Sequence, residues 1–526
     1  IINSKIGFSH FASLGNEMDV TESDMLEFFA EDANVKVIAM YVEGIQDGPR
    51  FMDVARKVSR RKPIVFLKAG KNDAGAKAVS SHTGSLAGSY AAYQAALAQA
   101  GVVEVETINQ LFNVAWALGT QPLPRCNRVA LTTNAGGAAA LAADSLAFNG
   151  FELARISPEI QQKLRTRLNP SAQVSNPVDM LGSVSPEDYR WSLENLDADE
   201  GVDVLLPILV PQALVDTLGV ANAWSEIGKN TKKTMLTCLM GERSTLESEQ
   251  CLNIAGVPVY AFPDEAGRVL KGMEQYKQLA DKPPFEPVKV MEVNHGKVSE
   301  TLDLVKGKQA VGEYETRAML EAYNIQNVPG DLAEDVDSAV RIAETIGYPI
   351  VMKIVSEDIL HKSDSGGIAL NIHNSDELRV EYDSMMARIA VNEPSAHIRG
   401  VMVEKMAPKG LEVIVGMRRD ATFGPLMMFG LGGTMVELLK DISFKVAPLT
   451  DQDIDEMIND TLAGRLLKGY RGSPKADIAA VKETIARLSQ LSLDNPEISE
   501  IEINPLVVYP EGQGAIALDS RAILRK

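Results

Sequence analysis

The stretch Ala78–Gly88, AVSSHTGSLAG, places one histidine, His82, among small side chains. Because Ser, Thr and Gly neighbours cannot bury it, the imidazole of His82 can reach solvent or a substrate. Neutral imidazole is a good nucleophile near pH 7 and can carry a phosphoryl group covalently. An isolated histidine of this kind is more often an exposed loop residue without a chemical role. The rest of the chain decides between these two interpretations.

A second group of candidate residues lies in the last third of the sequence. Lys353 sits within PIVMKIV, a run with the length and composition of a buried strand. A buried lysine is costly unless it meets an anion, which makes Lys353 a candidate for binding nucleotide phosphates. The alternative is an edge-strand lysine whose ammonium reaches water. The further candidates for nucleotide binding are Glu404 and Met406 at the end of VMVEKM, Glu412 in LEVIVG, and Gly430, Gly432 and Gly433 in FGLGGT.

The glycines of FGLGGT form a turn that lets backbone N–H groups approach a phosphate. An ordinary tight turn explains them equally well. The C-terminal carboxylates are more specific, because EIEINPL places Glu502 and Asn504 on one face of a strand by period-two alternation, and AIALDSR supplies Asp519. Two or three oxygen ligands from adjacent strands suit Mg²⁺, which prefers a few protein oxygens together with phosphate and water. The alternative is a solvated strand face.

Length and composition limit the possible functions. The chain has 526 residues, enough for about three domains, and its 45% apolar and 23% charged residues are typical of a globular protein. A net charge of −19 argues against nucleic acid as a partner. No apolar run approaches the roughly 18–20 residues that span a bilayer, so we expect no membrane partner. Cys126, Cys238 and Cys251 have no CxxC spacing and indicate reduced core thiols in a cytoplasmic protein.

The elements that must position these residues follow from the apolar runs. Strand-length runs followed by helix-like stretches, a pattern typical of parallel α/β sheets, occur at Lys36–Tyr41, Pro63–Lys68, Arg128–Thr132, Val202–Val210 and Thr234–Leu239. After the linker DKPPFEP at Asp281–Pro287, a charged helical stretch to about Val311 is expected to be a tether. From Glu313 the pattern becomes mixed α+β, with antiparallel-looking strands expected at Ile350–Val355, Gly400–Met406, Leu411–Met417, Leu426–Phe429 and Ile501–Leu506.

These motifs together resemble the ADP-forming (NDP-forming) acyl-CoA synthetases, also called acetate–CoA ligases. GYPIVMKIVSEDILHKSDSGGI, the segment Gly400–Gly416 and EINPL with LDSR are similar to an ATP-grasp domain, and SLGNEMDV, YVEGI, SSHTGSLAG, TTNAGGAA and NPVDMLG follow the family pattern nearer the front. The resemblance implies an α/β fold with two flavodoxin-like, succinyl-CoA-synthetase-like parallel-sheet domains followed by an ATP-grasp domain. The implied boundaries are 1–123, 124–285, a linker at 286–311, and 312–526.

The resemblance also implies roles for individual residues. His82 would be the phosphorylated histidine, and Glu43 would hydrogen-bond its ring. The N–H groups of Asn134, Gly136 and Gly137 would hold its phosphate at a helix N-terminus. Asp179 of NPVD would belong to the same region, with a turn-capping role as the alternative. His361, in ILHKSDSGG, would relay phosphate between a distant ATP site and His82, the alternative being a merely polar loop.

The implied reaction converts acyl-CoA, ADP and phosphate into a short carboxylic acid, most simply acetate, with CoA and ATP, and uses Mg²⁺. A homo- or hetero-oligomer is expected. The family's CoA-binding domain is missing from the front, and the chain begins at Ile1, so we expect a piece of a longer polypeptide. The alternative function is the synthetase-like regulatory part of a protein lysine acetyltransferase, but the intact SSHTGS favours the enzyme.

Overall fold

The computed structural model describes residues 7–15, 17, 19–72, 89–241, 244–290, 292–308, 310–356, 358–359, 365–433 and 441–525. The chain divides into two compact units, the first made of Ile1–Tyr90 and Leu97–Pro283 and the second of Ala91–Ala96 and Pro284–Lys526. The main break falls within the DKPPFEP stretch that the sequence identified as a linker.

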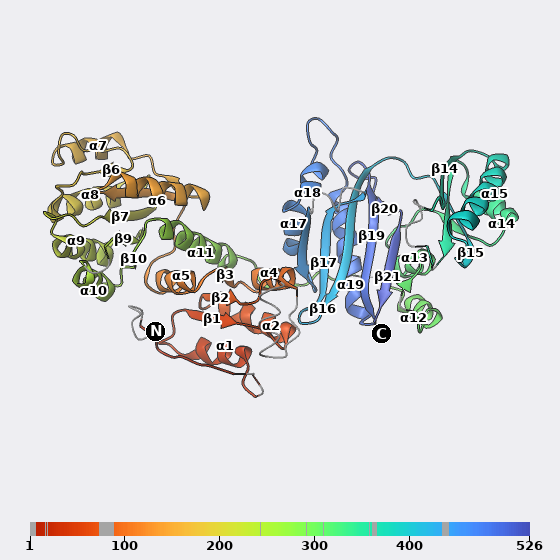
Figure 1. Cartoon of the computed structure of the whole chain (residues 1–526), viewed down its shortest axis with the longest axis horizontal. Coiled ribbons are helices and arrows are strands. Elements are labelled where there is room, and N and C mark those ends of the chain that lie inside the picture. The colour runs from red at the N-terminus through yellow and green to blue at the C-terminus, as the bar shows by residue number, and fades with distance from the viewer. Residues whose placement is uncertain are drawn as a thin grey trace. The chain divides into compact units, whose positions relative to one another are not determined.

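The first unit contains two parallel sheets (Figure 1). In its described part, one sheet has the order β1-β2-β3 and the other the order β10-β9-β7-β4-β5, with β6 on β4 and β8 on β7. Its strands are β1 (Ile38–Val42), β2 (Ile64–Lys68), β3 (Val103–Val105), β4 (Arg128–Thr133), β5 (Glu152–Leu153), β6 (Val178–Asp179), β7 (Val204–Leu209), β8 (Thr234–Met235), β9 (Thr237–Leu239) and β10 (Val259–Tyr260). The helices around them are α1 (Glu22–Glu31), α2 (Gly48–Ser59), α4 (Tyr90–Gln99), α5 (Ile108–Thr120), α6 (Gly136–Phe148), α7 (Pro158–Arg165), α8 (Pro186–Ala198), α9 (Thr217–Asn230), α10 (Leu246–Ile254) and α11 (Asp264–Ala280).

The larger sheet is covered on both faces, which explains its continuous apolar strands. In β4, Val129 and Leu131 pack into a core shared with α5, α6 and α11, whereas Ala130 faces a core formed with α8, α9 and α10. Because β4 and β7 pair in parallel, their carboxyl ends lie at the same edge of the sheet. Ligands bind at such edges in open α/β sheets.

The second unit contains two antiparallel sheets, each with its own core. The first has the order β11-β21-β19-β16-β17-β18, with β20 on β19, and the second has the order β12-β15-β13-β14. The strands are β11 (Ala310–Val311), β12 (Gly330–Ala333), β13 (Ile350–Ser356), β14 (Ile368–Ile372), β15 (Ile398–Lys405), β16 (Leu411–Asp420), β17 (Gly424–Leu431), β18 (Ile442–Val446), β19 (Ile498–Val508), β20 (Ala515–Ala517) and β21 (Ser520–Leu524). The helices are α12 (His295–Leu304), α13 (Glu313–Ala322), α14 (Val336–Ile346), α15 (Ser375–Asn392), α17 (Asp451–Asn459), α18 (Leu462–Leu467) and α19 (Ile478–Asp494). Figure 1 shows α14 and α15 beside the smaller sheet, in teal.

The expected fold class is confirmed, and most expected strands appear within two residues of their predicted ends. Three details were wrong. The run Thr234–Leu239 forms two short strands interrupted at Leu236. The stretch before Val311 is not a tether, because Val298 and Val305 lie in the core of the second unit. Cys126 is exposed rather than a core thiol, whereas Cys238 is buried.

Within the described residues, no helix is both long enough and apolar enough to cross a bilayer.

Glu22, the first residue of α1, and Glu17, which precedes the helix, make the stability of the protein depend on pH. Glu22 is 3% exposed, and burial followed by the charge and hydrogen bond of Glu22 raises the pKa of Glu17 from 4.5 to about 7. Because this folded-state pKa lies above the unfolded one, the folded protein holds an extra proton between pH 4.5 and 7. The unfolding free energy contributed by this group therefore falls as pH rises through that window.

Replacing Glu17 by Gln removes this titration. We expect the variant to gain about 2 °C in Tm over the wild type at pH 8 and much less at pH 5. Thermal unfolding of both proteins at the two pH values measures the difference, with Glu27→Gln on the exposed side of α1 as control. Equal gains at pH 5 and pH 8 would rule out the raised pKa as the cause.

Candidate active site

Lys353 lies in the middle of the smaller sheet of the second unit. Its strand, β13, is paired on both sides, with β15 and β14, so the alternative of an edge-strand lysine is wrong. The residue is only 9% exposed, and its ammonium contacts Glu313 Oε1 and Glu404 Oε2, both at 2.8 Å, and donates to the carbonyl of Leu518 at 2.6 Å. Burial alone would lower the pKa of Lys353, but Glu313, Glu404 and Asp519 outweigh it and raise that pKa above its usual value. The lysine is therefore a buried cation at neutral pH.

Two residues that the sequence reasoning missed complete this cluster. Arg317 is 7% exposed, forms a close ion pair with Glu404, and donates to the carbonyl of Val328 at 2.5 Å. Glu313 and Arg317 are four residues apart on α13 and point to the same side of the helix. This four-residue spacing, on the helix face that also carries Leu320, is the sequence signal that could have identified Glu313 and Arg317 as buried partners. Two cations and two carboxylates thus balance one another in a buried space.

Glu404 and Met406 were both expected to bind nucleotide. Glu404 is 2% exposed and lies opposite Val351 of β13, so its carboxylate faces the buried cluster. Met406 follows the end of β15, and its backbone N–H donates to the carbonyl of Pro349 at 3.0 Å. Met406 therefore lies where the chain leaves the smaller sheet, and its side chain is partly exposed.

The glycine turn lies against β16 in the larger sheet. The N–H of Gly432 donates to the carbonyl of Glu412 at 3.0 Å, and a Cβ on Gly432 would stand 2.6 Å from backbone atoms of Val413. Gly433 has φ of +69°, and its N–H donates to Asn504 Oδ1 at 3.1 Å. Both positions therefore require glycine, one for close approach and one for its backbone conformation.

The C-terminal oxygen ligands lie together next to that turn. Asn504 Nδ2 donates to Glu502 Oε1 at 3.2 Å, which confirms that the two side chains share a face of β19. The backbone N–H of Asn504 donates to the carbonyl of Asp519 at 3.0 Å. Leu518, whose carbonyl binds Lys353, directly precedes Asp519. One continuous group thus joins the lysine cluster, Asp519, Asn504, Glu502 and the Gly433 turn.

The carboxylate of Glu502 and the side-chain oxygen of Asn504 are of the kind that a hard cation binds. Glu502 Oε2 is bound by Arg521 at 3.0 Å, but the Arg521 side chain is 66% exposed and can turn toward water. The described residues contain no group of three His, Cys, Asp or Glu side chains arranged around a common metal position. A carboxylate with a neighbouring amide, as at Glu502 and Asn504, suits Mg²⁺, which retains water and phosphate oxygens, better than a metal that needs a full protein cage.

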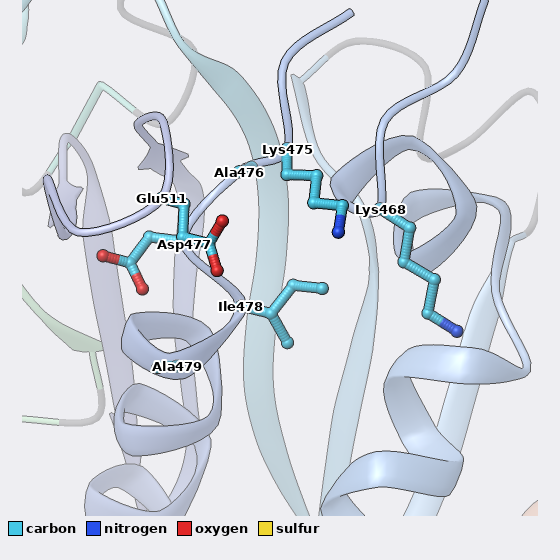
Figure 2. Close-up of a pocket in the computed structure, with 7 residues that line it drawn as sticks. All are labelled: Lys468, Lys475, Ala476, Asp477, Ile478, Ala479 and Glu511. Carbon is cyan, nitrogen blue, oxygen red and sulfur yellow. The ribbon is translucent and has the colours of Figure 1, made fainter.

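A pocket elsewhere in the second unit is separate from these residues. It has a volume of about 370 Å³ and is lined by Lys468, Lys475, Ala476, Asp477, Ile478, Ala479 and Glu511 (Figure 2). Figure 2 shows the two ammonium groups on one side and the carboxylates of Asp477 and Glu511 on the other. Asp477 caps α19 by accepting from the N–H of Ala480 and also accepts from the N–H of Gly514. The helix end is thus already satisfied by a carboxylate.

In the first unit, Glu43 directly follows β1 and is half-buried. The ammonium of Lys68, at the end of the neighbouring strand β2, donates to the carbonyl of Glu43 at 2.7 Å and also to that of Ala69. Lys68 is 4% exposed, and burial lowers its pKa. The buried lysine therefore fixes the backbone from which the Glu43 side chain starts.

The predicted phosphate-binding residues lie at the carboxyl end of β4. The Asn134 side chain exchanges two hydrogen bonds with the backbone of Val210, at 2.8 and 2.9 Å, and so ties the end of β4 to the end of β7. Gly136 and Gly137 open α6 and are exposed, and among the described residues no side chain caps this helix. The side-chain amide of Asn134 is thus structural, while the first turn of α6 keeps N–H groups at the surface.

Asp179 lies against the same turn. Its Oδ2 stands 3.1 Å from the position that a Cβ on Gly136 would occupy, and its Oδ1 accepts from the N–H of Leu181 at 3.1 Å. Both proposed roles for Asp179 are therefore compatible with its position, since it shapes a turn and also borders the α6 N-terminus. His82 and His361 lie outside the described residues.

Three family models match the chain. One described as a succinyl-CoA ligase like flavodoxin domain matches residues 2–118, a ligase-CoA domain matches residues 129–280, and an ATP-grasp domain matches residues 304–524. The ATP-grasp match contains Lys353, Glu404 and the Glu502–Asn504–Asp519 group.

Curated relatives resemble the chain over almost its full length. It is 42% identical to acetate–CoA ligase (ADP-forming) I of Archaeoglobus fulgidus over 521 residues, which cover 99% of this chain and 74% of that protein. It is 35% identical to 4-hydroxybutyrate–CoA ligase (ADP-forming) of Nitrosopumilus maritimus, covering 98% of this chain and 74% of that one. It is 30% identical to a trans-feruloyl-CoA synthase from an unknown prokaryotic organism, with 98% and 73% covered. These names differ in the acid, and none of them supports the regulatory-module alternative.

Proposed function

Because the chain belongs to the family of ADP-forming acyl-CoA synthetases, we propose that it interconverts acyl-CoA, ADP and phosphate with a short carboxylic acid, CoA and ATP. The observation that carries this proposal is the continuous group in the second unit. There a buried lysine, a glycine turn and the Glu502–Asn504–Asp519 oxygens are linked by hydrogen bonds. The proposed modules are 1–123, 124–285 and 312–526, with the packed stretch 286–311 belonging to the last of them.

Three displacements balance the proposed reaction. A phosphate oxygen attacks the thioester carbonyl, the C–S bond breaks, and CoA leaves as an acyl phosphate forms. A ring nitrogen of His82 attacks the phosphorus, the P–O bond to the acyl group breaks, and the carboxylate leaves. A β-phosphate oxygen of ADP then attacks this phosphorus, the P–N bond breaks, and ATP is released. His361 is proposed to carry the phosphoryl group between the two sites, which adds one displacement: a ring nitrogen of His361 attacks the phosphorus, the P–N bond to His82 breaks, and ADP then displaces His361. The reverse sequence activates the acid.

The residues of the chain have distinct proposed tasks. Glu43 orients the His82 ring, and the exposed N–H groups at the start of α6 neutralise its phosphate. Lys353 and the N–H groups of the Gly432–Gly433 turn bind the phosphates of the nucleotide, with Glu404, Met406 and Glu412 around it. Glu502, Asn504 and Asp519 hold Mg²⁺, which neutralises phosphate charge when bound. The name of the relative that is 42% identical supports acetate as the acid.

The test is phosphorylation of the purified chain by γ-labelled ATP with Mg²⁺. We expect acid-labile label on the wild type, no label on His82→Ala, and slower labelling of His361→Ala. Label that survives acid, or that persists in His82→Ala, would overturn the phosphohistidine. Acetate, 4-hydroxybutyrate and ferulate, each added with CoA, then identify the acid by the rate at which each discharges the label.

A further inference from the structure

Three side chains connect the two ends of the segment that carries His82. Lys71 lies just beyond the end of β2, Tyr90 is the first residue of α4, and Glu104 is the middle residue of β3. Residues 73–88, between Lys71 and Tyr90, lie outside the described residues. All three residues belong to the first unit.

Both ends of the segment bind the same oxygen atom. Lys71 Nζ lies 2.8 Å from Glu104 Oε1, and the hydroxyl of Tyr90 donates to that atom at 2.7 Å. The Lys71 ammonium also lies 5.3 Å from the centre of the Tyr90 ring and donates to the carbonyl of Val105 at 3.2 Å. The cluster therefore holds Lys71 and Tyr90 against each other as well as against β3.

The cluster is shielded enough for its charges to matter. The side chains of Lys71 and Glu104 are 24% and 19% exposed, so water and salt weaken their attraction less than for a surface pair. Burial opposes the charge on Lys71, but the contact with Glu104 outweighs it and raises the Lys71 pKa. Burial and the Glu104 contact raise the pKa of Tyr90, which keeps its hydroxyl as a donor.

Fixing both ends of a chain segment reduces the conformations available to the residues between them. A reacting group in such a segment reaches its productive geometry at a lower entropic cost. Glu104 is anchored for this task, because β3 pairs with β2 and its neighbours Val103 and Val105 are in the core. Lys71 and Tyr90 thereby acquire a rigid common support.

We propose that Lys71, Glu104 and Tyr90 form a positioning clamp for the phosphohistidine, fixing both ends of the His82 segment on β3 and thereby setting the rate of phosphoryl exchange. This inference rests on the proposed function of His82. The three side chains act through the backbone of the segment.

The test is the single-turnover rate of labelling from γ-labelled ATP and Mg²⁺, measured with the full chain alongside Tm and the ATP concentration that gives half-maximal labelling. We expect Glu104→Gln to slow labelling about tenfold with little change in the other two quantities. Tyr90→Phe, which keeps the ring beside Lys71, should slow it about threefold. Combining Lys71→Glu with Glu104→Lys restores an ion pair and should recover most of the rate lost in either single variant.

The matched control is the ion pair of Lys57 with Asp53 on α2, 2.7 Å long and well exposed, whose charge exchange should leave labelling unchanged. The clamp is refuted if Glu104→Gln and Tyr90→Phe label at the wild-type rate. The clamp is also refuted if each variant that labels more slowly has lost Tm in proportion, because the slower labelling would then reflect lost stability. If the wild type takes up no label, the proposed function and the clamp both fail. If the wild type is labelled but the clamp variants label at the same rate, only the clamp fails.

Discussion

Replacing Lys353 by Met is expected to lower the rate of labelling from ATP by about 10³-fold. The ammonium is a buried cation next to Asp519 and the Leu518 carbonyl, and a preorganised charge of this kind stabilises the charge that develops on a transferring phosphoryl group. Removing it also leaves Glu313 without its 2.8 Å partner. Breaking a buried ion pair by removing one partner costs about 3–5 kcal/mol of unfolding free energy, so the single variant loses stability as well.

A second substitution separates these two effects. Combining Lys353→Met with Glu313→Gln removes one charge of each sign, so Tm should return toward the wild-type value while labelling stays low. Lys233→Met is the control, since this half-buried lysine of the first unit donates to the carbonyls of Leu196 and Asp199. Recovery of labelling in the double variant would mean that Lys353 acts only on stability.

Replacing Glu502 by Gln is expected to raise the Mg²⁺ concentration needed for half-maximal labelling at least tenfold, with Asp519→Asn acting in the same direction. Glutamine retains an oxygen that can accept from Asn504 Nδ2 but removes the charge that binds a hard cation. The defect should therefore shrink at high Mg²⁺. Titrating Mg²⁺ at saturating ATP measures it.

Glu500→Gln is the matched control for this prediction. Glu500 lies on the same strand and also contacts Arg521, at 3.5 Å, but it precedes Glu502 and has no part in the proposed ligand set. Its removal should leave the Mg²⁺ requirement unchanged. If both variants shift the requirement equally, the effect is a general loss of negative charge and the assignment of Glu502 as a ligand is wrong.

The antiparallel strands of the second unit were predictable because each carries a run of buried residues bounded by turns. PIVMKIV also predicted that Lys353 is buried, since no alternation in that run offers the lysine an exposed face. The common face of Glu502 and Asn504 followed from the period of a strand. These inferences use only neighbours along the chain, which is the information that a single sequence contains.

Contacts between distant elements were not predictable in the same way. Glu313 reaches Lys353 across 40 residues, and Glu104 meets Lys71 and Tyr90 only because β2 and β3 pair in one register. The packing of α12 was missed although Val298 on the helix and Val305, which directly follows its end, are seven residues apart and lie in one core. Charged residues on its other side concealed that signal. The pairing of charged side chains from distant elements therefore depends on strand order and register.

In the role proposed for Lys353, its three contacts have a consequence for how a nucleotide would be bound and released. An ammonium has three N–H bonds, and here Glu313, Glu404 and the Leu518 carbonyl engage all of them. A phosphate oxygen must therefore take the place of one of these acceptors, so binding exchanges one partner for another instead of adding a new one. The binding free energy gained from this exchange of acceptors is only the difference between two similar attractions. A lysine held in this way would bind ADP or ATP without trapping either, as a reaction that runs in both directions requires.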